Sequence, residues 1–248
     1  MPDLPTSAIT AYILAGGRST RMGRDKAMLS LAGRTLLARA VATLRTVATE
    51  VVLLGDRIER PDLQGADRAI PDLHPGCGPV GGMETALRDL AASPTPEWAC
   101  FLPVDMPFLP AGLYAALIRR WLAEGRPVAY PIVDEGPQPL ITLLHRSVLP
   151  YLTAAVEIGR LKVTSVLEGA AKELGSPFGD GLHSGHIQLS TDLFLSSSPA
   201  KEEASAGLEL PWRPSAQQLA ARPLWFSNLN TPEEFAEGEA FLRASDWD

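Results

Sequence analysis

The sequence predicts a three-layer α/β fold in which helices cover both faces of a mostly parallel sheet. Short apolar segments that end in Gly or Asp have the length and content of buried strands, at residues 8–14, 50–54 and 97–104. Between them, apolar residues recur at helical spacing over 34–47 and 83–91. Strand and helix alternate in this way through the first 125 residues. That alternation is typical of βαβ units on a parallel sheet.

The rest of the chain is expected to add shorter elements around this sheet. In chain order they are a strand at 68–71, a Gly- and Pro-rich loop at 72–82, strands at 128–130 and 139–144, helices at 146–156 and 161–168, and a last strand at 223–229. A last helix starts at Thr231, because Pro232 suits the first helical position and Glu234 lies three residues after the capping Thr. Residues 175–222 show no sustained period and are expected to form a long loop or partly disordered insertion.

Length and composition indicate one globular domain. The chain has 248 residues, of which 46% are hydrophobic and 21% charged, so wholesale disorder is excluded. We expect a single domain over 1–248 that consists of two halves, residues 1–125 and residues 126–248, the second of which carries the insertion.

Charge and hydropathy exclude several classes of partner. With 22 Lys and Arg against 29 Asp and Glu the net charge is −7, which argues against nucleic acid. No apolar run approaches the roughly 18 residues that a membrane span needs, and the first residues lack the positive start of a secretory signal. We therefore expect a cytoplasmic protein without a membrane partner. Two cysteines 23 residues apart, with no CxxC motif, argue against a disulfide framework.

The strongest chemical signal is the segment LAGGRSTRMGRDK, residues 14–26, which directly follows the first strand. Gly16 and Gly17 leave the backbone free to approach a ligand, and four cations fall within the nine residues 18–26 of an otherwise acidic chain. A polyphosphate is the natural ligand of such a loop. The spacing matches neither the P-loop nor the GxGxxG dinucleotide motif.

This segment resembles the signature LAGGxSxRMGxDK of nucleotidyltransferases of the molybdenum cofactor guanylyltransferase type. Every fixed position of the signature is present, as Leu14, Ala15, Gly16, Gly17, Ser19, Arg21, Met22, Gly23, Asp25 and Lys26. The resemblance implies a Rossmann-like nucleotidyltransferase fold in which the turn from Leu14 to Gly17 wraps GTP. It also implies that Arg21 holds the phosphates and Lys26 contacts the nucleotide, both as catalytic residues.

A third expected catalytic residue, Asp105, follows the strand at 97–104. Ligands of open α/β sheets bind at the carboxyl ends of the strands, and a triphosphate there needs a divalent cation with a hard oxygen ligand. The segment PVDMPFLP resembles the family segment whose Asp holds Mg²⁺, which makes Mg²⁺ the expected cofactor and Asp105 part of the GTP site. The alternative is that Asp105 only caps the next turn.

Two further segments extend the resemblance. In IPDLHPGCGPVGG, Asp72 is the position expected to accept hydrogen bonds from guanine, and Gly78 belongs to the same GTP-binding loop. Gly16 also favours guanine, because related cytidylyltransferases usually read LAAG at the first turn. In NLNTPEE, Asn230 falls where related enzymes supply a second metal contact, although it could simply precede a capping box.

The implied reaction is transfer of GMP from GTP to the phosphate of molybdopterin or Mo-molybdopterin, with release of pyrophosphate. Gln138 and His145, in a stretch that resembles the pterin-side strand, are the expected acceptor contacts. The resemblance thus makes residues 1–125 the nucleotide-binding half and residues 126–248 the acceptor-binding half. Molybdoenzymes or their chaperones would be partners that receive the product. Two alternatives stay open: cytidylyl or other nucleotidyl transfer to molybdopterin or another small phosphate, and a non-catalytic protein that binds nucleotide or cofactor.

Overall fold

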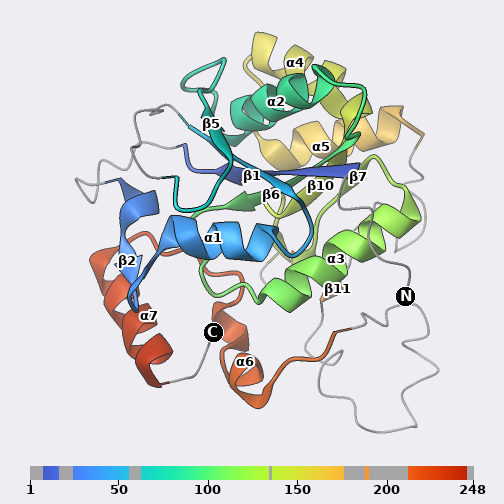
Figure 1. Ribbon diagram of the computed structural model, residues 1–248. Helices are drawn as coiled ribbons and strands as arrows, with labels where there is room; N and C mark the ends of the chain where they lie inside the picture. Colours follow the sequence, from blue (N-terminus) through green and yellow to red (C-terminus); the bar gives the residue numbers. More distant parts are fainter. Residues whose placement is uncertain are drawn as a thin grey trace, which may run out of the picture.

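The computed structural model of the protein describes residues 8–16, 25–55, 63–133, 136–175, 188–189 and 212–244 (Figure 1). Its centre is a six-stranded sheet in the order β5-β4-β1-β6-β10-β7. The bounds of these strands, in chain order, are β1 Ile9–Leu14, β4 Glu50–Leu54, β5 Arg68–Ile70, β6 Trp98–Pro103, β7 Val128–Ala129 and β10 Thr142–His145. The neighbouring strands β5, β4, β1 and β6 run parallel to one another. The strand β10 runs antiparallel to both of its neighbours, β6 and β7.

Helices cover both faces of the sheet, which makes the three layers that the sequence predicts (Figure 1). On one face lie α1 (Leu36–Leu44) and α3 (Ala111–Glu124), and on the other lie α2 (Gly78–Ala91), α4 (Leu149–Glu157) and α5 (Val163–Glu173). Within the residues that the structure describes, no helix is long and apolar enough to cross a membrane.

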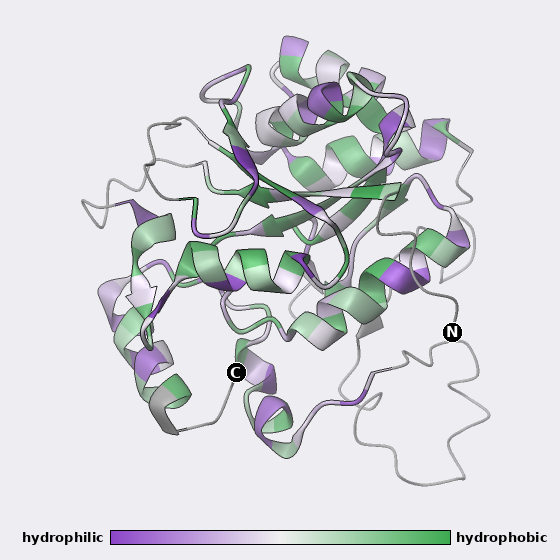
Figure 2. Ribbon diagram, viewed as in Figure 1, coloured by the Kyte–Doolittle hydropathy of each residue, from purple (hydrophilic) through white to green (hydrophobic). Residues whose placement is uncertain are grey.

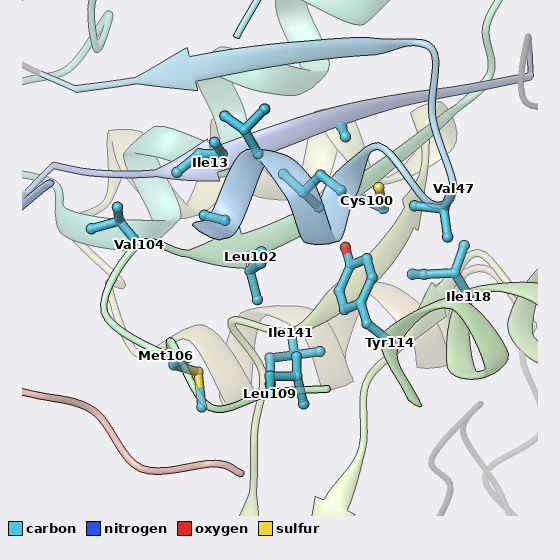
Figure 3. Packing of buried hydrophobic residues seen from close by; sticks show 14 of the residues in the cluster. Ile13, Val47, Cys100, Leu102, Val104, Met106, Leu109, Tyr114, Ile118 and Ile141 are labelled. Atoms are coloured by element: carbon cyan, nitrogen blue, oxygen red, sulfur yellow. The ribbon is translucent and has the colours of Figure 1, made fainter. Parts of the chain in front are cut away.

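The alternation of side chains along the strands separates two hydrophobic cores. In β1, Ile13 packs in the core of α1 and α3, whereas Tyr12 packs in the core of α2, α4 and α5. Figure 3 shows Ile13 of β1, Leu102 of β6 and Tyr114 of α3 in the first of these cores. Hydropathy follows the same division, with hydrophobic residues along the strands and on the helix sides that meet them (Figure 2). Both faces of the sheet are therefore buried, as a parallel sheet requires.

The two cysteines lie in different surroundings. Both are free, and Cys100 lies fully buried in β6. Burial raises the pKa of the Cys100 thiol to about 12, so this side chain acts as a small hydrophobe.

A network of charges ties α2 to the amino-terminal ends of the strands. Asp89 of α2 accepts a bidentate pair of hydrogen bonds from Arg68, at 2.7 and 2.8 Å, and one from the Tyr12 hydroxyl at 2.7 Å. Arg68 also binds Glu50 at 2.8 Å. Burial alone would raise the pKa of Asp89, but the hydrogen bonds from Arg68 and Tyr12 outweigh it and lower that pKa.

Several small elements surround the main sheet. They are the 3-10 turns η2 (Lys26–Met28), η3 (Arg146–Val148) and η6 (Arg222–Leu224), the pair β2 (Ser30–Leu31) with β3 (Arg34–Thr35), the three-stranded group β11 (Gln188–Leu189), β8 (Ile132–Val133) and β9 (Gly136–Pro137), and the helices α6 (Ala216–Ala220) and α7 (Pro232–Ala244). The helix α7 lies beside β2 (Figure 1).

The prediction of a strand at 223–229 is wrong, because this segment forms the 3-10 turn η6 and a further turn directly after it. Pro223 has no N–H to give to a sheet, and the amide of Trp225 donates to Arg222 O at 3.2 Å inside the turn. Apolar side chains that suggest a strand project from this turn into the core instead. Trp225 is buried there, and its ring meets that of Trp212 edge to face.

Two other boundaries also differ from the sequence expectation. The helix α2 begins at Gly78, inside the expected loop 72–82, because Pro79 suits the first helical turn and the small Gly81 and Gly82 allow close packing there. Of the expected insertion at 175–222, residues 176–187 and 190–211 lie outside the described residues, while the described part includes β11 and α6.

Candidate active site

The candidate site lies at the carboxyl ends of the parallel strands. From β1 the chain passes through α1 to β4 on one side, and from β5 it passes through α2 to β6 on the other side. The order therefore reverses between β1 and β6, which is where open α/β sheets bind ligands. Gly16, Asp72 and Asp105 each follow the end of one of these strands, after β1, β5 and β6.

Three side chains from distant parts of the chain converge at this point. The ammonium of Lys26 donates to Asp105 Oδ2 at 2.7 Å and to Asn230 Oδ1 at 2.8 Å. The side chains of Lys26 and Asp105 are 16% and 22% exposed, so the pair is partly shielded but open to a ligand. A cation is thus held between a carboxylate oxygen and an amide oxygen. Three residues that the sequence singled out, Lys26, Asp105 and Asn230, meet in space.

Local backbone structure places each of the three. Asp25 caps η2 by accepting from the amide of Ala27 at 3.1 Å, which orients the turn that carries Lys26. The amide of Leu229 donates to the backbone carbonyl of Asp105 at 3.0 Å and brings the segment before α7 to the end of β6.

The capping box of α7 is present but does not occupy the Asn230 side chain. Glu234 accepts from the amide of Thr231 at 3.0 Å, and Thr231 Oγ1 accepts from the amide of Glu234 at 3.2 Å. Only the backbone N–H of Asn230 joins this arrangement, as a donor to Glu234. The amide side chain is therefore available for the contact with Lys26, so capping and ligand binding are compatible roles of this segment.

Asp72 lies over the first glycine-rich turn. A Cβ placed on Gly16 would lie 3.1 Å from Asp72 Oδ2, and one placed on Gly82 would lie 3.8 Å from Asp72 Oδ1. The absence of a side chain at Gly16, just after β1, and at Gly82 of α2 thus makes the room that this carboxylate fills. Gly16 and Asp72, which separately favour guanine in the sequence, are neighbours in the fold.

The other expected GTP-binding residues fall into two groups. The carbonyl of Leu14 accepts from the amide of Val104 at 3.1 Å, and the amide of Ala15 donates to Leu54 O at 3.1 Å, so both are fixed by the neighbouring strands. Gly78 is the first residue of α2 and has a φ of +57°. Gly17 and Arg21 lie outside the described residues.

The two expected acceptor contacts lie at opposite ends of the sheet. Gln138 precedes β10, and β10 begins opposite Phe101 near the end of β6, on the side of Asp105. His145 ends β10 and pairs with Trp98, the first residue of β6, against whose ring it packs at a centroid distance of 4.8 Å. There Nδ1 of His145 lies 2.9 Å from Ser147 Oγ, and burial lowers the pKa of the imidazole. The structure therefore does not bring His145 to the candidate site.

The residues present fit a divalent cation that is held partly by its substrate. No group of three or more His, Cys, Asp or Glu in the described part of the chain could hold a metal ion unaided. Mg²⁺, however, is commonly bound by one or two carboxylates together with substrate phosphates. The oxygens of Asp105 and Asn230, which already converge on one ammonium, are the hard ligands that this cation prefers.

One buried charge in this region gives no signal in the sequence. Glu84 is four residues before Arg88 on α2, a spacing that usually marks an exposed helical ion pair. In the fold its side chain is fully buried and approaches the loop that carries Asp72.

Residues 11–173 match the family described as MobA-like NTP transferase domain. The chain belongs to this family. It is accordingly an enzyme of the nucleotidyltransferase class, and the fold and family that the glycine-rich motif predicts are confirmed.

Curated relatives carry more specific names. The chain is 39% identical over 145 residues to a molybdenum cofactor guanylyltransferase of Xanthomonas euvesicatoria, an alignment that covers 58% of this chain and 69% of that one. It is 36% identical over 162 residues to a probable molybdenum cofactor guanylyltransferase of Deinococcus radiodurans, covering 64% and 80% of the two chains.

Solved structures confirm the fold and show that the fold does not fix the substrate. A molybdopterin-guanine dinucleotide biosynthesis protein A from Archaeoglobus fulgidus matches with a TM-score of 0.63 at 19% identity, covering 96% of this chain and all of that chain. A 2-C-methyl-D-erythritol 4-phosphate cytidylyltransferase from Thermus thermophilus matches with a TM-score of 0.56 at 17% identity, covering 94% and 98%. The choice of base and acceptor must therefore come from particular residues.

Proposed function

We propose that this protein transfers GMP from GTP to the phosphate of molybdopterin, forming a guanine dinucleotide and pyrophosphate. The observation that carries the proposal is the convergence of Lys26, Asp105 and Asn230 at the point where the strand order reverses. Such a cluster of one cation and two hard oxygens suits a magnesium triphosphate. The names of the curated relatives support guanine as the base and molybdopterin as the acceptor.

The main physical difficulty of this reaction is that an anionic phosphate must approach the anionic α-phosphate of GTP. Asp105 and Asn230 would hold Mg²⁺, which would supply positive charge to the triphosphate and to the leaving pyrophosphate. Lys26, whose ammonium contacts both of these oxygens in this structure, would supply a further positive charge beside the cation, toward the phosphates. The attacking phosphate is already ionised near neutral pH, so the reaction does not require a general base.

Recognition of guanine is assigned to Asp72. A carboxylate can accept hydrogen bonds from both N1–H and the exocyclic amine of guanine, whereas cytosine offers no such pair of donors. The room that Gly16 leaves for the Asp72 carboxylate supports this role. Gly17 and Arg21, in the segment outside the described residues, are proposed to bind the phosphates, together with the backbone from Leu14 and with Gly78.

For the acceptor, we retain Gln138 and not His145. Gln138 lies on the same edge of the sheet as Asp105, while the place of His145 beside Trp98 offers no route to that edge. Mg²⁺ as the metal, a single catalytic domain over residues 1–248, a cytoplasmic location and delivery of the product to molybdoenzymes or their chaperones complete the proposal.

Pyrophosphate release by the purified protein tests the proposal. Release is expected with GTP, molybdopterin and Mg²⁺ together, and it should disappear when any one of them is left out. Release that does not depend on molybdopterin would contradict the proposed acceptor. Binding of GTP without any release would favour a non-catalytic cofactor-handling protein.

A further inference from the structure

The carboxylate of Glu84, on α2, is buried with one of its two oxygens unsatisfied. The side chain is 0% exposed. Its Oε1 accepts from Arg88 Nε and, at 3.2 Å, from Thr153 Oγ1 of α4. Its Oε2 has no hydrogen-bond partner. Leaving a buried polar atom unsatisfied is costly, so a donor is expected to reach Oε2 in the working enzyme.

The nearest candidate donor is His74. Its Nε2 lies 3.7 Å from Glu84 Oε2, about 0.5 Å beyond the range of an N–H···O hydrogen bond. The imidazole is 46% exposed, so it can move by this amount. A small shift of His74 toward α2 would therefore satisfy the buried oxygen.

His74 belongs to the loop that carries Asp72, and this loop lies directly on α2. The amide of Leu73 donates to Thr85 Oγ1 at 3.0 Å. A Cβ on Gly81 would lie 2.7 Å from Cys77 Cβ and 3.2 Å from His74 O, so the loop and the helix are in close contact there. The position of the Asp72 carboxylate thus depends on how residues 73–77 are held against α2.

We propose that Glu84 and His74 are positioning residues for nucleotide recognition. Glu84, fixed on one side by Arg88 and Thr153, holds His74 through Oε2 and thereby holds Asp72 over Gly16 in the orientation that binds guanine. Neither residue touches the reacting phosphates in this role. Because Thr153 lies on α4, the same carboxylate also ties the loop to the half of the protein assigned to the acceptor.

The inference rests on the proposed function, and steady-state kinetics of two substitutions at His74 tests it. His74→Leu removes the donor, whereas His74→Gln keeps an N–H that can reach Oε2. We expect His74→Leu to raise KM for GTP about two- to fivefold, the range for one half-exposed polar pair, with kcat unchanged. His74→Gln should recover much of the loss. Leu73→Gln, which changes an exposed side chain in the same loop, is the matched control and should leave KM unchanged.

Glu84→Gln is a second variant, which keeps the size of the side chain and removes its charge. It should raise KM for GTP in the same direction as His74→Leu. In an Asp72→Asn background, His74→Leu should have no further effect on GTP affinity, because a positioning residue acts only through the group that it positions. An equal loss with and without Asp72, or an equal fall in kcat for the Leu and Gln variants, would overturn the proposal.

Hydrogen exchange in the free protein separates this inference from the proposed function. The amides of Leu73 and Cys77, which donate to Thr85 Oγ1 and to His74 O, should exchange faster in His74→Leu and Glu84→Gln than in the wild type. Unchanged exchange would contradict the positioning role even in an active enzyme. If the wild type showed no turnover with GTP, the proposed function would fail while the exchange experiment still decided this inference.

Discussion

Replacing Gly16 by Ala tests the spatial link between the first glycine-rich turn and Asp72. The new Cβ would lie 3.1 Å from Asp72 Oδ2, closer than an ordinary van der Waals contact, and 3.8 Å from Gly55 Cα. The carboxylate must therefore move by a few tenths of an ångström. Hydrogen bonds to a charged group contribute about 1.5–3 kcal/mol each, so weakening one of two such bonds to guanine should raise the Kd for GTP about 10- to 100-fold.

Calorimetric titration with GTP and with CTP measures this effect directly. The loss should be larger for GTP than for CTP, because a Cβ on Gly16 crowds the turn for both nucleotides but disturbs the Asp72 carboxylate only for guanine. Gly82→Ala is the matched control: its Cβ would lie 3.8 Å from Asp72 Oδ1, an ordinary contact, and 3.2 Å from the flexible end of Leu14. If Gly16→Ala bound GTP as tightly as the wild type, or lost affinity for both nucleotides alike, the assignment of Asp72 to the base would be refuted.

Three further predictions concern other parts of the fold. Asp105→Asn should lower Mg²⁺-dependent turnover about 100-fold or more without changing the melting temperature, and retention of about a tenth of the activity would exclude the metal role. The pKa of Asp89 is lowered by its hydrogen bonds to Arg68, so its contribution to stability is present above the unfolded pKa of about 3.9 and is lost as pH falls through the folded value. Asp89→Asn should thus flatten the acid limb of a stability-against-pH curve measured by urea unfolding; an unchanged limb would contradict this. Gly112→Ala would place a Cβ 2.2 Å from Trp212 Nε1, so it should displace that indole and shift the tryptophan fluorescence to longer wavelength, whereas an unaltered spectrum would show that Trp212 packs elsewhere.

The sequence predicted the part of the site that depends on strand ends. Asp105 follows the buried strand β6 and Asp72 follows the edge strand β5, and the carboxyl ends of parallel strands meet at one edge whatever the details of packing. Lys26 and Asn230 were placed there only by the family resemblance, because no periodicity relates residues 204 positions apart. The close approach of the Asp72 carboxylate to Gly16 could not be predicted from the sequence, since it depends on how the turn after β1 meets the loop after β5.

The wrong predictions arose where local patterns have more than one physical cause. Apolar residues around Trp225 suggest a strand, but they are buried equally well from a turn. His145 was named as an acceptor contact by the resemblance of its stretch to a pterin-side strand, and the structure places it at the other end of β10 from the side where Asp105 lies. Glu84 was missed because a Glu and an Arg four residues apart indicate a solvated pair unless tertiary contacts bury one of them.

A competition assay tests the central claim most directly. The protein is incubated with molybdopterin, Mg²⁺ and equal concentrations of GTP and CTP, and the dinucleotide product is identified by its mass. Guanylyl transfer predicts that the guanine dinucleotide predominates and that pyrophosphate appears in equal amount. A product containing cytosine would keep the chemistry of Lys26 and Asp105 but contradict the roles given to Gly16 and Asp72, and the absence of any dinucleotide would contradict the proposed reaction itself.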